Sequence, residues 1–271
     1  MKIKVAVLSL LVVFVLSCNS KENKRPNILF IMSDDHTSQA WGIYGGVLKD
    51  YVKNTNIKRL ADEGAVLNNA FCTNSICVPS RASILTGQYS NKNGVYTLSQ
   101  PLESDSMNIA KVLQKHGYQT AIVGKWHLKK QPTGFDHFMV LPGQGRYNDP
   151  ILKLKEDWNE GKNGGKVYKG FSSDVIADFS IDWLKNKEKS KPFFLMTHFK
   201  ATHEPFDYPE RHKDMFENVD IPEPESLYDF GAETTGRSFM GQKLDYLTER
   251  WVKASENPDQ SFMPYPGLPF S

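Results

Sequence analysis

Short apolar segments alternate with amphipathic segments along most of this chain, and this alternation constrains the fold more than any other feature. The apolar runs suited to buried strands occupy residues 27–32, 65–71, 120–123 and 193–196. Apolar residues recur at helical spacing between them, in residues 57–64, 109–117 and 176–184. Such alternation favours an α/β fold, a doubly wound and mostly parallel sheet with helices on both faces.

Two stretches depart from this rhythm. Residues 144–170 are polar and rich in Gly and Lys, so we expect a surface excursion there. Beyond Phe206 proline recurs, and the pattern predicts only one helix, over residues 242–252.

The charge balance argues against a nucleic-acid partner. The 271 residues contain 33 Lys and Arg against 31 Asp and Glu, so the net charge is close to zero. A nucleic-acid surface requires a basic excess that is absent here. Selectivity for any anion must therefore come from the placement of individual side chains.

The N-terminus has the pattern of an export signal. A short basic start precedes an apolar run from Val5 to Leu16, which predicts a signal peptide over residues 1–17. The sequence Val15-Leu16-Ser17-Cys18 resembles a bacterial lipobox, which implies cleavage before Cys18 and lipidation of that cysteine. Residues 18–25 would then be a polar tether, anchoring an exported protein to a bacterial membrane, at the outer membrane or the periplasmic face. The alternative is a secreted protein with an unmodified cysteine.

A predicted helix begins at Cys77 and ends before Gly87. Pro79 falls in its first turn, where the missing backbone donor costs nothing, and glycine is the usual residue just past a helix end. The side chain at position 77 is thus expected beside free amides and the positive end of the helix dipole, an environment that suits an anion. Arg81, one turn later, can point to the same place. The alternative is a buried structural cysteine.

This helix resembles the signature of the formylglycine-dependent sulfatases, C-x-P-S-R followed by T-G, in Cys77, Pro79, Ser80, Arg81, Thr86 and Gly87. The resemblance implies an alkaline-phosphatase-like sulfatase core in which a maturation enzyme oxidises Cys77 to formylglycine. It also implies that the aldehyde is hydrated: one hydroxyl attacks the sulfur of a sulfate ester, and the other then loses its proton and expels sulfate. The closest likeness is to bacterial enzymes for sulfated sugars, of the N-acetylglucosamine-6-sulfatase or algal-polysaccharide type.

Asp34 and Asp35 follow the first predicted strand. Carboxylates at a strand end can supply hard oxygen ligands for Ca²⁺ or Mg²⁺, although a solvated turn is the common alternative. The pair also matches the family's N-terminal motif. The resemblance therefore implies a Ca²⁺ site, with Mg²⁺ as the other possibility, formed by Asp34, Asp35 and residue 77.

Two further motifs match the family. In Gly124-Lys125-Trp126-His127, Lys125 and His127 share one face of an extended backbone. By resemblance, Lys125 contacts sulfate, and His127 orients the formylglycine diol or helps remove its proton. The family's K-A-P-H-x-P motif reappears with threonine at its third position, and it implies that Lys200 contacts sulfate and that His203 is a general acid or sulfate ligand. His198, between these motifs, is expected to be packed in the core or beside the site.

These motifs predict hydrolysis of sulfate esters on a carbohydrate. The family's later D-H-G or D-N-G motif has no match, and we therefore expect residues 26–271 to be the N-terminal portion of a sulfatase domain whose C-terminal part is missing. The alternatives are a truncated or inactive homologue that binds glycans from a lipid anchor, and a phosphoesterase of the same superfamily.

Overall fold

The computed structural model describes residues 25–158 and 164–223. The predicted signal peptide, Cys18 and the predicted helix over residues 242–252 lie outside these residues. Among the helices that the structure describes, none has both the length and the apolar character needed to cross a bilayer.

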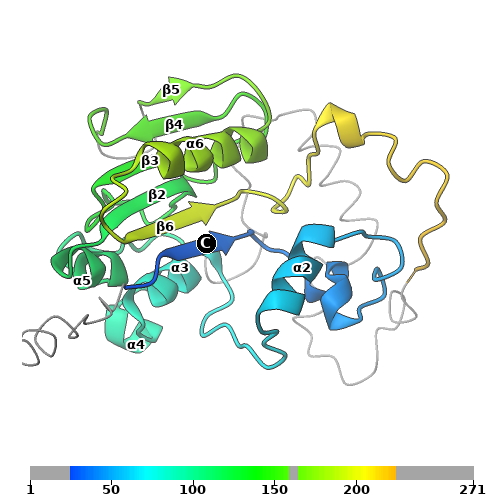
Figure 1. Cartoon of the computed structure of the whole chain (residues 1–271), viewed down its shortest axis with the longest axis horizontal. Coiled ribbons are helices and arrows are strands. Elements are labelled where there is room, and N and C mark those ends of the chain that lie inside the picture. Colours follow the sequence, from blue (N-terminus) through cyan, green and yellow to red (C-terminus); the bar gives the residue numbers. More distant parts are fainter. Residues whose placement is uncertain (1–24, 159–163, 224–271) are drawn as a thin grey trace, which may run out of the picture.

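A mixed sheet forms the centre of the described structure (Figure 1). Its six strands lie in the spatial order β1-β6-β2-β3-β4-β5. Pairing is parallel between β1, β6, β2 and β3, and antiparallel from β3 to β4 and from β4 to β5. The strand bounds are β1 Ile28–Met32, β2 Gln119–Lys125, β3 His137–Leu141, β4 Ile151–Leu154, β5 Lys166–Val167 and β6 Phe193–His198.

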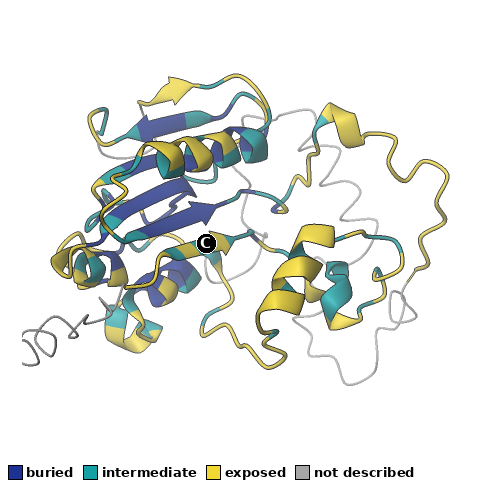
Figure 2. Ribbon diagram, viewed as in Figure 1, coloured by how far each residue is buried: buried dark blue, intermediate teal, exposed yellow. Residues whose placement is uncertain are grey.

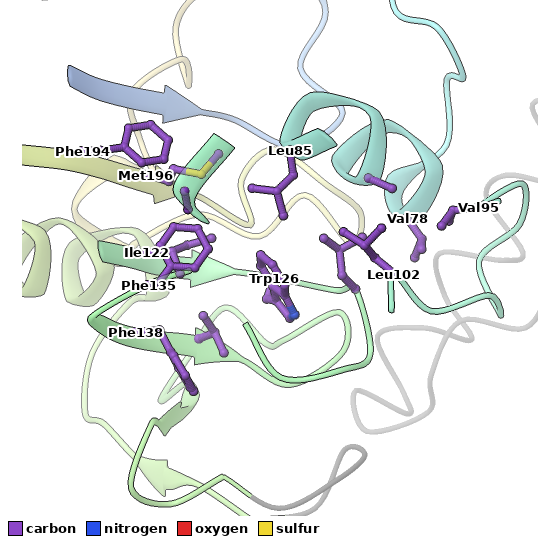
Figure 3. Close-up of a cluster of buried hydrophobic side chains, with 14 of the residues drawn as sticks. Val78, Leu85, Val95, Leu102, Ile122, Trp126, Phe135, Phe138, Phe194 and Met196 are labelled. Carbon is purple, nitrogen blue, oxygen red and sulfur yellow. The ribbon is translucent and has the colours of Figure 1, made fainter. Parts of the chain in front are cut away.

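Helices cover both faces of this sheet, as the sequence predicted. Helices α3 (Cys77–Thr86) and α5 (Ile109–Lys115) share one hydrophobic cluster with β2, β3 and β6. Figure 3 shows Val78 and Leu85 of α3 within this cluster, together with Ile122 and Phe138 of the sheet. Helix α6 (Ser172–Asn186) packs on the opposite face through a second cluster. The doubly wound, mostly parallel fold is therefore confirmed.

Burial is greatest in the middle of the sheet (Figure 2). Strand β2 is buried in all but its first residue, and β6 follows the same pattern. By contrast, α2 (Thr55–Glu63), η1 (Ser38–Ala40) and η2 (Gly42–Tyr44) contain no buried residue and lie to one side of the sheet. The short helices α4 (Ser90–Asn93) and η3 (Glu210–His212) are also peripheral. The central strands are thus the rigid support from which a site at their ends can be built.

Two expectations from the sequence are wrong. Residues 65–71 form a loop between α2 and α3 rather than a strand, and no strand of the described structure pairs with them. Leu67 is 71% exposed and Phe71 is 89% exposed, so the apolar side chains of this run gain no burial. The stretch 144–170 is more than a surface excursion, because β4 and β5 extend the sheet within it and Leu152 is fully buried.

Candidate active site

The residues predicted to carry chemistry meet at the carboxyl ends of the parallel strands. Asp34 follows β1, Lys125 ends β2, and Lys200 follows β6. Strands β6 and β2 are neighbours and β6 also pairs with β1, so these three chain ends lie side by side. Ligands bind at this edge in open α/β sheets. The first turn of α3, with Cys77, completes the site.

A buried group of charges forms its inner side, and we call Asp34, Arg81, Lys125 and His198 the inner cluster. Lys125 Nζ donates to Asp34 Oδ2, and Arg81 Nη2 lies 3.3 Å from Asp34 Oδ1. Lys125 is 0% exposed and Asp34 is 5% exposed. Burial alone would raise the pKa of the Asp34 carboxyl, but the Lys125 ammonium and the Arg81 guanidinium lower it below its ordinary value.

Backbone bonds hold Asp34 in this position. Its amide donates to the carbonyl of Ala201 at 2.9 Å, and the amide of Thr202 donates to the carbonyl of Asp34 at 2.8 Å. The loops after β1 and β6 are thereby tied together. Two chain segments that are far apart in the sequence therefore fix the position of the Asp34 carboxylate.

Arg81 and His198 complete the inner cluster. Arg81 Nη1 donates to the carbonyl of Lys125 at 2.6 Å and lies 3.2 Å from His198 Nδ1, which is itself 3.1 Å from the same carbonyl. Burial, reinforced by the Arg81 charge, lowers the pKa of His198 to about 3. His198 is therefore neutral near pH 7 and packs beside the site, as the sequence predicted.

Cys77 begins α3, one turn before Arg81. Burial raises the pKa of its thiol above the ordinary value, the Lys125 ammonium opposes that shift, and the Asp34 carboxylate adds to it. The net rise means that the thiol stays protonated near pH 7. A protonated thiol is a poor nucleophile, so the unmodified cysteine is poorly suited to thiolate chemistry.

The outer side of the site is formed by loop residues, and we call Asp35, Lys200 and His203 the outer group. His203 Nε2 lies 3.6 Å from Asp35 Oδ2, and His203 Nδ1 lies 2.8 Å from the carbonyl of Glu204. A carbonyl only accepts, so Nδ1 carries the proton and Nε2 presents a lone pair when the ring is neutral. Burial, together with Lys125 and Lys200, lowers the pKa of His203.

Lys200 is almost fully buried, yet it has no carboxylate within ion-pair distance among the described residues. Its Nζ lies 4.8 Å from the centre of the Tyr147 ring and 3.4 Å from the carbonyl of Glu204. Burial, reinforced by the Lys125 charge, lowers the pKa of Lys200 to about 8. A cation held this way retains its attraction for an incoming anion.

The carboxylates of the site, Asp34 and Asp35, offer the oxygen donors that suit a hard divalent cation. Ligand atoms of Asp34, Cys77 and His203 all lie within 4.8 Å of one another, and the Asp35 carboxylate adjoins His203. Carboxylate oxygens are preferred by Ca²⁺ and Mg²⁺. In the structure Asp34 is bonded to Lys125 and Arg81, so a cation would have to replace the ammonium on Asp34.

His127 lies beside the inner cluster rather than within it. Its side chain is buried, and its Nδ1 has no hydrogen-bond partner among the described residues. Burial, together with the charges of Lys125 and Arg81, lowers its pKa to about 3. The ring lines a cavity of about 70 Å³ whose other walls include Trp126 and Trp158.

Two residues of the loop after β3 join the site although the sequence did not single them out. Gln144 Oε1 accepts from Lys125 Nζ at 2.5 Å, and the Tyr147 hydroxyl donates to the carbonyl of His203. The signal that could have indicated them is the pair of glycines at 143 and 145, both of which have positive φ and bend this loop back toward the site.

Comparison with known proteins places this geometry in a family. The model of the Sulfatase family matches residues 26–251. The N-acetylglucosamine-6-O-sulfatase of Bacteroides thetaiotaomicron is 42% identical over 237 residues, which are 85% of this chain and 40% of the relative.

Solved structures agree with that match. One, in complex with its substrate D-glucosamine-2-N,6-O-disulfate, superposes with a TM-score of 0.74 at 36% identity, covering 89% of this chain and 50% of the other. The phosphonate monoester hydrolase of Agrobacterium radiobacter shares the fold, with a TM-score of 0.54 at 22% identity, covering 73% of this chain and 45% of the other. The chain thus spans about half the length, or less, of these relatives. With the signature helix, the sheet-edge cluster and the family match in agreement, the chain belongs to the sulfatase family.

Proposed function

We propose that this chain hydrolyses sulfate esters of a sulfated carbohydrate, using a formylglycine made from Cys77. The observation that carries the proposal is the arrangement of three cationic side chains around position 77, with two carboxylates beside them. Arg81 and Lys125 are fixed by the inner cluster, and Lys200 approaches from the outer side. A singly charged sulfate ester suits a site whose cations exceed its carboxylates.

The cations of the site would bind and orient the sulfate group. Lys125 has two partners in the structure, Asp34 and Gln144, so release from Asp34 leaves the ammonium held by Gln144 and directed to an anion. Lys200 has no carboxylate partner in the described structure and could contact sulfate directly. Fixed charges in a dry site stabilise developing negative charge without reorganisation.

Asp34 and Asp35 are the residues that would hold a divalent cation, with residue 77 beside them. Ca²⁺ is the proposed ion and Mg²⁺ the alternative; either would supply positive charge to polarise the sulfate group. His203, whose ligand atom lies within 4.8 Å of those of Asp34 and Cys77, would contact a sulfate oxygen beside that cation. The formylglycine hydrate would supply the attacking oxygen at position 77.

The two histidines differ in their capacity to move protons. His127, with a pKa of about 3, remains neutral near pH 7 and is suited to orienting a hydroxyl. His203 has its pKa lowered by burial and by neighbouring lysines, and a bound anion would raise it again because the added charge offsets theirs. His203 is therefore the proposed general acid at the leaving oxygen.

A 6-O-sulfated glucosamine is the proposed substrate class. The 42% identical relative is named an N-acetylglucosamine-6-O-sulfatase, and the solved structure with a TM-score of 0.74 holds D-glucosamine-2-N,6-O-disulfate. The phosphonate hydrolase resembles this chain in fold alone, so it lends no support to phosphate chemistry. A sulfated amino sugar is accordingly the first substrate to test.

Export and lipid anchoring through Cys18 are part of the proposal, supported by the sequence of residues 1–25. Incorporation of a labelled fatty acid into the full chain, and its loss in Cys18→Ala, would support the anchor. Label that persists in Cys18→Ala, or is missing from the unchanged chain, would contradict it.

The activity is tested on the full chain coexpressed with a formylglycine-generating enzyme. Intact-mass and peptide analysis should show an aldehyde at position 77, and the protein with added Ca²⁺ should release sulfate from glucosamine 6-O-sulfate. Cys77→Ala should release none, whereas the matched Cys72→Ala should remain active. An aldehyde-bearing, Ca²⁺-loaded protein that frees no sulfate from any sulfated sugar would contradict the proposal, and faster release from an aryl phosphate than from an aryl sulfate would favour phosphoesterase activity.

A further inference from the structure

The loop after β3, residues 142–149, approaches both lysines of the site. Gln144 Oε1 accepts from Lys125 Nζ at 2.5 Å, and the Tyr147 ring lies 4.8 Å from Lys200 Nζ. Neither contact from this loop involves a carboxylate, although Lys125 also pairs with Asp34 in the inner cluster. We infer that this loop positions both lysines for anion binding through uncharged groups, an inference that rests on the proposed function.

An uncharged partner has a specific advantage at an anion site. A carboxylate beside a lysine fixes the ammonium but also repels the anion that the lysine must attract. An amide oxygen or an aromatic face orients the ammonium without adding a full negative charge. Gln144 would also keep Lys125 in place once Asp34 turns to a divalent cation.

The loop is itself rigidly supported. Gly143 and Gly145 have positive φ, and a Cβ added at Gly145 would lie 2.8 Å from the Leu141 side chain, so the turn requires glycine there. The Tyr147 ring stacks on Phe171 with centroids 5.4 Å apart, and the Tyr147 carbonyl accepts from the amide of Ser172 at 2.6 Å. The start of α6 thereby fixes the ring that faces Lys200.

Tyr147 contacts the site in two ways that substitutions can separate. Its ring faces Lys200, and its hydroxyl donates to the carbonyl of His203. Tyr147→Phe keeps the ring and removes the hydroxyl bond, whereas Tyr147→Leu removes both. Gln144→Leu removes the acceptor for Lys125. Gln144→Glu keeps an acceptor but adds a negative charge, which would repel the sulfate group.

The test measures binding of inorganic sulfate alongside turnover of glucosamine 6-O-sulfate, in the full chain with Ca²⁺. We expect Tyr147→Leu and Gln144→Leu each to weaken sulfate binding and raise KM about tenfold, as loss of one such contact implies, with a smaller change in kcat. Tyr147→Phe should stay within about threefold of the unchanged protein in sulfate affinity, because the cation–π contact remains. Gln144→Glu should weaken sulfate binding at least as much as Gln144→Leu.

Matched controls are Tyr168→Leu and Gln114→Leu, whose contacts are to Phe179 and Asp136 and lie away from the site. Both should leave sulfate affinity unchanged, and thermal unfolding of every variant reports folding separately. Unchanged sulfate affinity in both Tyr147→Leu and Gln144→Leu overturns the inference, as does a Tyr147→Phe defect equal to that of Tyr147→Leu. If Tyr147→Leu fails to fold, the sulfate affinities of Gln144→Leu, Gln144→Glu and Tyr147→Phe still test whether the loop positions the lysines.

Failure of the proposed function has a different signature. A protein that binds sulfate but releases none from the sugar would contradict sulfatase activity, while its variants would still support or overturn the role of the loop. Turnover that proceeds with no effect of the loop substitutions overturns the inference alone. A protein that binds no sulfate at all overturns both.

Discussion

The inner cluster and the outer group differ in what holds them together. The members of the inner cluster are buried and contact one another: Arg81 contacts the side chains of Asp34 and His198 and the backbone of Lys125, although His198 Nε2 has no partner among the described residues. The outer group rests mainly on backbone carbonyls and an aromatic ring, and Asp35 is largely exposed. The difference indicates that buried contacts fix the inner cluster before any ligand binds, whereas contacts to mostly uncharged groups hold the outer group.

The strongest test of this difference is Arg81→Met, which removes a buried charge from the inner cluster. It leaves Asp34 with Lys125 as its cationic partner and removes the bond of 2.6 Å that Arg81 donates to the Lys125 carbonyl. We expect the free energy of unfolding to fall by about 3–5 kcal/mol, the usual cost of breaking a buried ion pair. Urea unfolding of the full chain followed by circular dichroism measures it.

Arg211→Met is the matched control for Arg81→Met. Arg211 binds Asp174 through two bonds of 2.6 and 2.8 Å, but both side chains are exposed. Its loss should leave the unfolding midpoint unchanged, because exposed ion pairs contribute little. Equal losses for Arg81→Met and Arg211→Met would show that burial does not distinguish the inner cluster.

The next test is the pH dependence of stability due to Lys200 in the outer group. Its pKa of about 8 in the folded chain lies below the ordinary value of 10.5, so above pH 8 the unfolded chain holds more protons than the folded chain. Stability due to this residue must therefore rise with pH between about 8 and 10.5, by up to about 3 kcal/mol.

Comparison with Lys200→Met isolates this effect. As pH rises from 7 to 10, the free energy of unfolding of the unchanged chain should increase relative to that of Lys200→Met. Lys125, whose pKa is also lowered by burial, is present in both proteins, so the difference reports Lys200 together with its repulsion of Lys125. A difference that stays constant over this range would mean that Lys200 is not desolvated as the structure indicates.

The smallest effect is expected from Asp35→Asn. Because Asp35 is exposed and forms only a 3.6 Å contact to His203, its replacement should not change the unfolding midpoint. It should weaken Ca²⁺ binding about tenfold, since affinity follows the number of charged ligands. Calorimetric titration with Ca²⁺ measures this, and Asp62→Asn, which removes an exposed carboxylate paired with Lys58 on α2, is the control.

The sequence predicted the architecture because its strongest signals come from apolar strand runs. The runs that became β2 and β6 lie in the interior of the described sheet and are almost wholly buried, whereas the run that became β1 forms an edge of that sheet and has no buried residue. Residues 65–71 carry a similar run, yet no strand within residues 25–158 and 164–223 pairs with them. Strands β4 and β5 were missed because an antiparallel extension within a polar stretch is decided by pairing with β3, which local composition does not encode.

The site residues likewise fall into those that the sequence could place and those that it could not. Asp34, Lys125 and Lys200 could be placed together in advance because they follow strands whose ends share one edge. Gln144 and Tyr147 could not, since their contacts depend on the path of a loop set by two positive-φ glycines and by the start of α6. That His203, rather than Asp35, groups most closely with Asp34 and Cys77 likewise depends on loop conformation.

The shared carboxylate of Asp34 has a thermodynamic consequence. One carboxylate oxygen cannot bind an ammonium and a divalent ion equally well. Binding of the ion therefore releases Lys125 to bind an anion, and binding of an anion to Lys125 releases Asp34 to bind the ion. Linkage is reciprocal, so each ligand must raise the affinity for the other by the same factor. Calcium and sulfate are therefore expected to load cooperatively, in either order.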